Sequence, residues 1–262
     1  MTPVPALDPI FAPLTYPGAA PDGPAVLVTD TDVLCVHPSR IAQVGQWRVT
    51  LSPAADISLD QILLKHQAAP MTGRAPVLAV GSNAAPAQIH RKFAATDRPI
   101  MVPITAVTVS GLSVGVSAHV SKAGYVPATP VPDPSAKSHM WVTWLAPEEL
   151  ITMDKTEPNY SRVLVPAACS VKLTSGQAVS GCWLYVSRHG FLAESESSRK
   201  PRKLIDQPHL IASLLAEVPI LTDLAGTSPK EWMNRTQDER VRDEIRDLFR
   251  SAGITRTTDL DS

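Results

Sequence analysis

The sequence predicts an α+β fold, and two patterns indicate it. Residues 104–120, ITAVTVSGLSVGVSAHV, alternate apolar with small residues, which is typical of strands with one buried face. Residues 207–218 and 228–253 instead place apolar residues at helical spacing, as on the buried stripe of an amphipathic helix. Strands and helices thus occupy different parts of the chain, and we expect an α+β protein with C-terminal helices.

Three parts follow one another along the chain. Residues 1–74 are expected to form an N-terminal extension with an irregular proline-rich arm, short strands in residues 25–51 and a short helix after Ser58. Residues 75–190 carry most of the strand patterns and are expected to form the central β domain. Residues 191–262 are expected to form a polar connector and two C-terminal helices.

Local signals predict the limits of the elements, because proline suits the first turn of a helix and glycine its end. Helices are expected at Pro86–Phe93, at residues 146–155, from Pro208, and from Ser228 to Gly253. Strands of the central part are expected at Val77–Val80, Ile100–Leu112, Val114–Val120, Met140–Leu145, Ser161–Pro166, Ala168–Leu173 and Ala178–Val186. Since proline does not fit a central strand, the proline-rich stretch after Val126 is expected to be a long loop.

The composition argues against several classes of protein. A net charge of −1 gives no general attraction to nucleic acid or to anionic lipid. No apolar run reaches the roughly 18 residues of a membrane span, and the N-terminus lacks the basic start of a signal peptide. The cysteines, Cys35, Cys169 and Cys182, show no metal-ligand spacing. We therefore expect a cytoplasmic protein with no metal, and with neither nucleic acid nor membrane as a partner.

Residues 77–93, VLAVGSNAAPAQIHRKF, hold the first candidate site. A strand pattern ends there in Gly81, Ser82 and Asn83, and a helix is expected to begin soon after. A glycine lets a ligand approach the backbone, and the N–H groups at a helix start attract anions. The backbone N–H groups of these three residues are therefore a candidate anion site. The alternative is a plain turn between a strand and a helix.

Residues 150–165, LITMDKTEPNYSRVLV, hold the second candidate site. Glu157 lies directly before Pro158, so it belongs to the end of a helix rather than to its interior. A carboxylate at the end of an element beside a sheet is a candidate general base. An exposed surface carboxylate is the alternative.

Together the two segments resemble the gamma-glutamylcyclotransferase-like superfamily. Its members carry a first strand ending Tyr-Gly-Ser-Asn, then Leu-Asp-x-x-Glu-Gly followed by Tyr-x-Arg. The matching residues here are 80–83, then 153–158 followed by 160–162. Val80 stands in place of the usual Tyr, and Pro158 in place of the usual Gly. The resemblance covers roughly residues 75–190.

The resemblance implies a mixed β-barrel with flanking helices and an enzyme that needs no cofactor. Family enzymes cyclise a small γ-glutamyl amide: the α-amine attacks the γ-carbonyl, and 5-oxoproline and an amine are released. Glu157 would then be the catalytic acid and base, and the backbone of the Gly81–Asn83 turn would hold a carboxylate or the oxyanion. Tyr160 and Tyr185 would line the cavity and contact the substrate; a structural role is their alternative.

Other functions stay open. The cavity could bind a small carboxylate or amine without turnover, or the chain could serve as an interaction module. Ser82 and His90 could form a hydrolase pair, although no Gly-x-Ser-x-Gly elbow is present. The feature that separates these functions is whether Glu157 points into the same cavity as the turn. The apolar stripes of the C-terminal helices also need a partner surface, in this chain or in a second copy, which allows a homo-oligomer.

Overall fold

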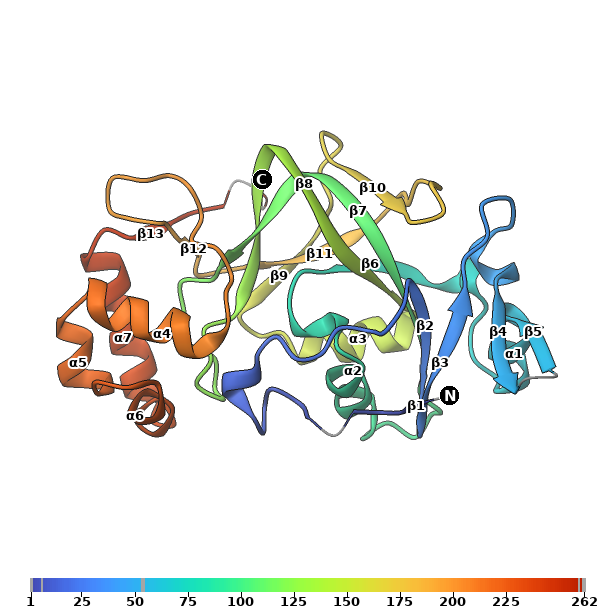
Figure 1. Cartoon of the computed structure of the whole chain (residues 1–262), viewed down its shortest axis with the longest axis horizontal. Helices are drawn as coiled ribbons and strands as arrows, with labels where there is room; N and C mark the ends of the chain where they lie inside the picture. The colour runs from blue at the N-terminus through green and yellow to red at the C-terminus, as the bar shows by residue number, and fades with distance from the viewer. Residues whose placement is uncertain (1, 6, 53–54, 259, 261–262) are drawn as a thin grey trace.

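The computed structural model describes residues 2–5, 7–52, 55–258 and 260 of the chain (Figure 1). Both strands and helices are abundant in it, which confirms the expected α+β class. The strands are β1 (Thr2–Pro3), β2 (Ala25–Thr29), β3 (Asp32–His37), β4 (Arg48–Ser52), β5 (Ala55–Ser58), β6 (Ala75–Ala79), β7 (Met101–Val116), β8 (Ala128–Leu145), β9 (Tyr160–Leu164), β10 (Ser170–Leu173), β11 (Trp183–Ser187), β12 (Phe191–Leu192) and β13 (Thr255–Arg256). The α-helices are α1 (Leu59–Lys65), α2 (Pro86–Phe93), α3 (Pro147–Lys155), α4 (Gln207–Glu217), α5 (Ile220–Ala225), α6 (Pro229–Arg235) and α7 (Glu239–Ser251).

One large mixed sheet forms the centre of the molecule. Its main path runs β5-β4-β3-β2-β7-β8-β6-β11-β9, while β1 pairs with β3 and β10 pairs with β7. The pair β6–β11 is parallel, and the other pairs along this path are antiparallel. Among the described strands β5 and β9 stay at the two ends of the path, so the sheet is not closed. The expected barrel is therefore not confirmed.

The prediction of a long loop after Val126 is wrong, because most of this stretch belongs to strand β8. Pro130 and Pro132 pair with Val114 and Leu112 of β7. Strand β6 pairs only with residues 141–145 of β8, so among the described strands the proline-rich half of β8 is paired on one side only. Prolines at alternate positions of an edge strand can turn their nitrogens away from the ladder, so no hydrogen bond is lost.

The N-terminal extension is joined to this sheet. Strands β2 and β3, among the short strands expected in residues 25–51, form a hairpin, and β2 continues the sheet by pairing with β7. Helix α1 begins as expected after Ser58, whose side chain accepts a hydrogen bond from the Gln61 amide. Leu27 and Trp47 share one apolar cluster with Val109 of β7. The division of the chain at residues 74 and 190 stays a prediction.

The C-terminal part holds four helices instead of the two expected, within the residues that the structure describes. Pro219 has no N–H to donate, so α4 ends before it, and α5 follows. The helix expected from Ser228 to Gly253 is interrupted at Asp238, whose side chain accepts from the Arg240 amide and starts α7 as a separate helix. The apolar stripes of these helices pack on one another and on the end of β7, so they are buried within this chain.

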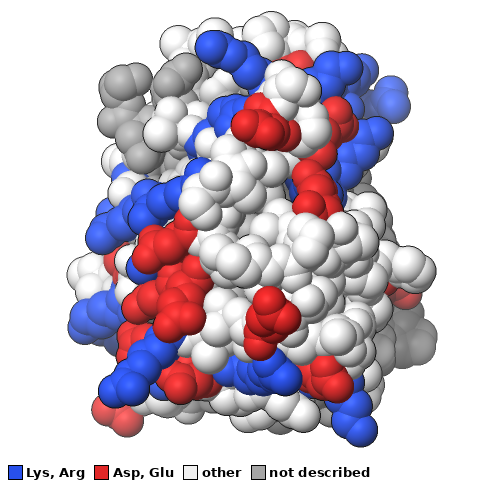
Figure 2. All heavy atoms as spheres, turned by 90° about the vertical axis from the view of Figure 1, so that its left-hand side faces the viewer, with Lys and Arg blue, Asp and Glu red and all other residues white. Residues whose placement is uncertain are grey.

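Figure 2 looks at the end of the molecule formed by these helices. Basic and acidic side chains alternate over this face, and on α7 they pair, as in Arg246 with Asp243 at 2.8 Å. A face with both signs of charge is a solvated surface rather than a binding site for phosphates. No helix in the described part of the chain combines the length and the apolar character that crossing a membrane requires.

Helices α2 and α3 position the candidate site. Their bounds agree with the expected ones, and they lie beside each other below the sheet (Figure 1). Ile89 and Phe93 of α2 and Met153 of α3 pack in one cluster with Val77 of β6 and Tyr185 of β11. This packing brings the residues before α2 and those after α3 to the same place, although about 70 residues separate them along the chain.

Candidate functional site

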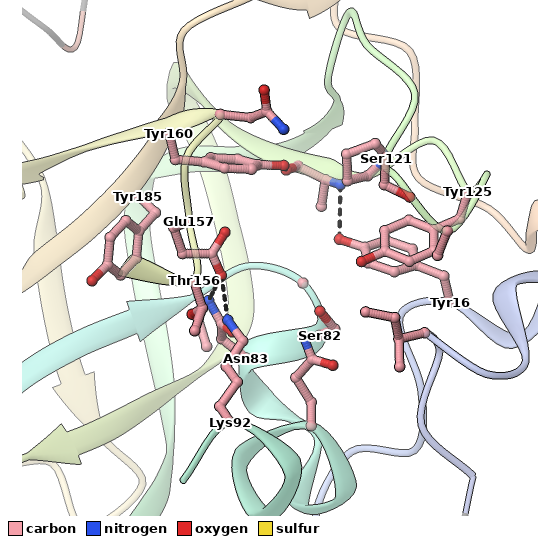
Figure 3. A pocket seen from close by; sticks show the side chains of 18 of the residues that line it. Tyr16, Ser82, Asn83, Lys92, Ser121, Tyr125, Thr156, Glu157, Tyr160 and Tyr185 are labelled. Carbon is pink, nitrogen blue, oxygen red and sulfur yellow. Dashed lines mark hydrogen bonds and ion pairs between the residues drawn. The ribbon is translucent and has the colours of Figure 1, made fainter. Parts of the chain in front are cut away.

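A cavity of about 420 Å³ lies where α2 begins and α3 ends (Figure 3). Every site residue expected from the sequence lines it, namely Gly81, Ser82, Asn83, Glu157, Tyr160 and Tyr185. Other lining residues were not expected, among them Tyr16, Lys92, His119 and Tyr125. All four tyrosines of the chain therefore border this one cavity. The expected residues come together, while their roles stay predictions.

The Gly-Ser-Asn turn forms one wall. Residues Ser82–Ala84 make a single turn of 3-10 helix ahead of α2. The Ala85 amide donates to the Ser82 carbonyl at 2.9 Å, which closes the turn. The Thr143 hydroxyl of β8 donates to the Asn83 carbonyl at 3.0 Å and ties the turn to the sheet. The backbone of this wall is thus fixed before any ligand arrives, as electrostatic preorganisation requires.

Gly81 is required by space. Its φ of −141° lies outside the positive range that favours glycine. A side chain at this position would overlap the Tyr16 hydroxyl and press on the Cβ of Ala128. The close approach expected at Gly81 is therefore made by a tyrosine of the protein itself.

Glu157 faces the turn across the cavity mouth (Figure 3). Its Oε1 accepts a hydrogen bond from Asn83 Nδ2 at 2.9 Å and from Lys92 Nζ at 2.5 Å. Its side chain is only 14% exposed. The carboxylate and the turn therefore share one cavity, which is the geometric condition that a general base at Glu157 needs.

Lys92 is the main residue that sequence reasoning missed. Its side chain is 2% exposed, and besides Glu157 it donates to Asn83 Oδ1 at 2.7 Å. Burial lowers the pKa of Lys92 from its ordinary value, and the Glu157 carboxylate beside it opposes that shift. A signal was present in the sequence, because Lys92 lies on the same face of α2 as the buried Ile89 and Phe93. Lysine rarely occupies a buried face unless it is paired.

Asp154 and Arg162, both in the second segment that resembles the superfamily, hold the end of α3 in place. Arg162 of β9 binds Asp154 through two hydrogen bonds, of 2.9 and 3.2 Å, and lies 4.4 Å from the centre of the Trp183 ring. The Tyr185 hydroxyl donates to Asp154 Oδ1 at 2.7 Å. The hydroxyl of Tyr185 is therefore committed to the protein, although its ring borders the cavity. Together these contacts orient the residues that follow α3, including Glu157.

These contacts make the stability of the fold depend on pH. Burial raises the pKa of Asp154, but hydrogen bonds from Arg162 and Tyr185 outweigh it, so the pKa lies below its ordinary value. A carboxyl with a lowered folded-state pKa stabilises the fold above its unfolded pKa of about 3.9, and this contribution disappears as the pH falls through the folded-state pKa. We expect Asp154→Asn to be less stable than wild type at about pH 7, with the difference shrinking as the pH falls through the folded-state pKa of Asp154. Urea unfolding across this pH range measures it, and a constant difference would contradict the expectation.

Two aromatic side chains complete the upper wall. The Tyr160 hydroxyl donates to the Ala128 carbonyl at 2.9 Å, and its ring extends over the cavity beside Glu157 (Figure 3). His119 contacts the Ser117 hydroxyl through Nδ1 at 2.7 Å. Burial, with a smaller contribution from His189, lowers the pKa of His119 to about 3, so this ring is uncharged at neutral pH.

The geometry does not support the alternative hydrolase pair. His90 Nε2 lies 2.7 Å from the Asp30 carbonyl oxygen, outside the residues that line the cavity with Ser82. His90 is therefore not placed to act as a base for the Ser82 hydroxyl. Within the described residues, no three His, Cys, Asp or Glu side chains gather in a way that could hold a metal ion.

No protein-family model matches the chain, and no curated protein matches it. Solved structures do match. One titled gamma-glutamyl cyclotransferase gives a TM-score of 0.38 at 13% identity and covers 66% of this chain and 99% of its own. An uncharacterised human protein gives 0.38 at 14% identity, over 66% of this chain and 98% of its own. A yeast gamma-glutamyl cyclotransferase specific to glutathione gives 0.31 at 11% identity, over 69% and 96%.

Scores and identities of this size are too low to transfer the activity of those proteins to this chain.

Proposed function

We propose that the cavity binds a small γ-glutamyl amide and cyclises it, releasing 5-oxoproline and an amine. The observation that carries the proposal is the position of Glu157. Its Oε1 accepts a hydrogen bond from Asn83 Nδ2, in the Gly81–Asn83 turn, at 2.9 Å. A partly buried carboxylate and a fixed wall of backbone amides in one cavity are the parts that an intramolecular acyl transfer needs. The volume of about 420 Å³ suits a substrate of this size.

In this mechanism Glu157 moves protons between the two nitrogens. It takes a proton from the α-ammonium, and the freed amine attacks the γ-carbonyl carbon. A C–N bond forms, and the carbonyl oxygen becomes an oxyanion. Glu157 then delivers protons to the leaving nitrogen, and the old C–N bond breaks. One of the three ammonium protons stays on the lactam nitrogen, and the other two leave with the amine, which departs as an ammonium ion.

The other residues bind and position. The backbone amides of Gly81, Ser82 and Asn83 face the oxyanion or the substrate carboxylate. The rings of Tyr160 and Tyr185 wall the cavity and limit the water in it. The nucleophile belongs to the substrate, so the proposed reaction calls for no cofactor.

The test is a panel of γ-glutamyl dipeptides and γ-glutamyl amines incubated with the purified protein. Mass spectrometry follows both 5-oxoproline and the free amine. The matched control is the α-linked isomer of each dipeptide, in which cyclisation would not release the second residue. Release of both products from γ-linked substrates alone supports the proposal, and no release from any member of the panel contradicts it.

A second candidate function is binding of a small ligand without turnover. The observation in its favour is the ion pair between Glu157 and Lys92, which occupies the carboxylate with a partner from the protein. A carboxylate held by a cation of the protein can have a structural role with no part in turnover. This candidate would be supported over the enzyme if calorimetry shows binding of 5-oxoproline or glutamate and no member of the substrate panel gives product.

A further inference from the structure

Tyr16 belongs to the N-terminal arm, outside the residues that resemble the superfamily, yet it forms part of the cavity wall. Its side chain is buried, and its ring stacks on that of Tyr125 with the centres 4.2 Å apart and the planes 16° from parallel. The arm is also anchored to α2 by an ion pair between Asp8 and Arg91 at 2.7 Å. These contacts hold the ring of Tyr16 in one orientation.

The Tyr16 hydroxyl accepts a hydrogen bond, but its own proton has no acceptor among the described residues. The Ala128 amide donates to the Tyr16 oxygen at 2.9 Å. A phenol oxygen that accepts from an amide still carries one proton of its own to donate. Among the described residues no oxygen or nitrogen accepts that proton. Since the oxygen accepts from the Ala128 amide, the O–H bond is directed away from that amide.

The unused proton lies on the cavity side. Figure 3 shows the hydroxyls of Tyr16 and Tyr125 facing the cavity from the wall opposite Glu157. Gly81 leaves the space in which this hydroxyl sits, since any side chain there would overlap it. The Tyr16 hydroxyl thus stands next to the Gly-Ser-Asn turn, where a ligand oxygen would be bound.

We propose that the Tyr16 hydroxyl donates a hydrogen bond to the γ-carbonyl oxygen of the substrate and to the oxyanion that it becomes. This inference rests on the proposed function. In the tetrahedral intermediate the attacking and the leaving nitrogens are both served by Glu157, so both lie on its side of the carbon. The oxygen then points to the opposite wall, which holds Tyr16 and Ser82. A donor fixed in advance at this position stabilises the charge as it develops.

The surroundings keep this donor in its protonated form. Burial, with a smaller contribution from Tyr125, raises the pKa of Tyr16 above its ordinary value. The hydroxyl therefore keeps its proton over the whole range in which an enzyme of this kind works.

The test is Tyr16→Phe, which keeps the stacked ring and removes only the hydroxyl. Losing one preorganised donor is expected to lower kcat about a hundredfold, with KM changed by less than about threefold. The matched control is Thr15→Val, which removes an exposed hydroxyl from the neighbouring residue of the same arm and is expected to leave kcat unchanged. Thermal unfolding of both variants reports on whether the arm stays packed.

Binding of 5-oxoproline separates this inference from the proposed function. If wild type shows no turnover but binds 5-oxoproline, and Tyr16→Phe binds it about tenfold more weakly, the donor role stands and the cyclotransferase fails. If Tyr16→Phe equals wild type in both turnover and binding, the donor role is overturned while the enzyme stands. If wild type neither turns over the panel nor binds 5-oxoproline, both are overturned.

Discussion

Replacing Glu157 by glutamine is expected to lower kcat for the release of 5-oxoproline by about a thousandfold, with little change in KM. Glutamine keeps the size of the side chain and a hydrogen bond to Asn83 but cannot take a proton from the α-ammonium. Glu157→Asp keeps the carboxylate and withdraws it by one methylene, so an intermediate loss is expected. Initial rates by mass spectrometry of 5-oxoproline give all three values.

The matched control lies on the same helix. Glu148 of α3 is exposed and pairs with Arg98 outside the cavity, so Glu148→Gln is expected to leave kcat unchanged. If Glu157→Gln kept more than about a tenth of the wild-type kcat, Glu157 would not be the acid and base of the reaction.

Replacing Lys92 by methionine is expected to reduce the free energy of unfolding by about 3 kcal/mol, because it leaves the buried Glu157 carboxylate without its cation. Glu157→Gln is also expected to be destabilising, since the ammonium of Lys92 is 2% exposed and loses its anion. In the double variant both charges are absent. We therefore expect its loss of stability to be smaller than the sum of the two single losses by about 2 kcal/mol.

Urea unfolding at constant pH measures the four members of this cycle, and equal m-values show that the comparison is sound. The control is Arg98→Met, which breaks the exposed pair with Glu148 and is expected to change stability by no more than about 0.5 kcal/mol. Strict additivity of the two single variants would show that Lys92 and Glu157 do not interact energetically. The double variant also serves the first prediction, because its base is absent while neither buried charge is left unpaired.

The limits of α2 and α3 and the cap at Ser58 were predictable, because each depends on residues next to it in the chain. Pro86 and Pro147 begin their helices as expected, and Ser58 accepts from the amide three residues on. The meeting of Asn83 with Glu157 was predictable only through the family resemblance. No local pattern records a contact between residues 74 positions apart.

Local patterns also misjudged elements whose environment is set at a distance. The prolines of β8 argued for a loop, but they occupy a segment that pairs on one side only, where proline costs no ladder hydrogen bond. The helix expected from Ser228 to Gly253 runs through residue 238, but residues 234–240 are all polar, and an aspartate cap there divides the helix in two. The barrel that the resemblance implies is an open sheet here, because β5 and β9 remain at its ends among the described strands.

By itself, the sequence determined the α+β class, most of the helix limits and the residues that carry the family motifs. These depend on side-chain size, backbone angles and caps, which act over a few residues. Only the tertiary structure decided that Lys92 would pair with Glu157 and that Tyr16 would reach the Gly-Ser-Asn turn from the N-terminal arm. Those contacts join segments far apart in the chain, and they form because packing of the whole sheet and its helices brings the segments together.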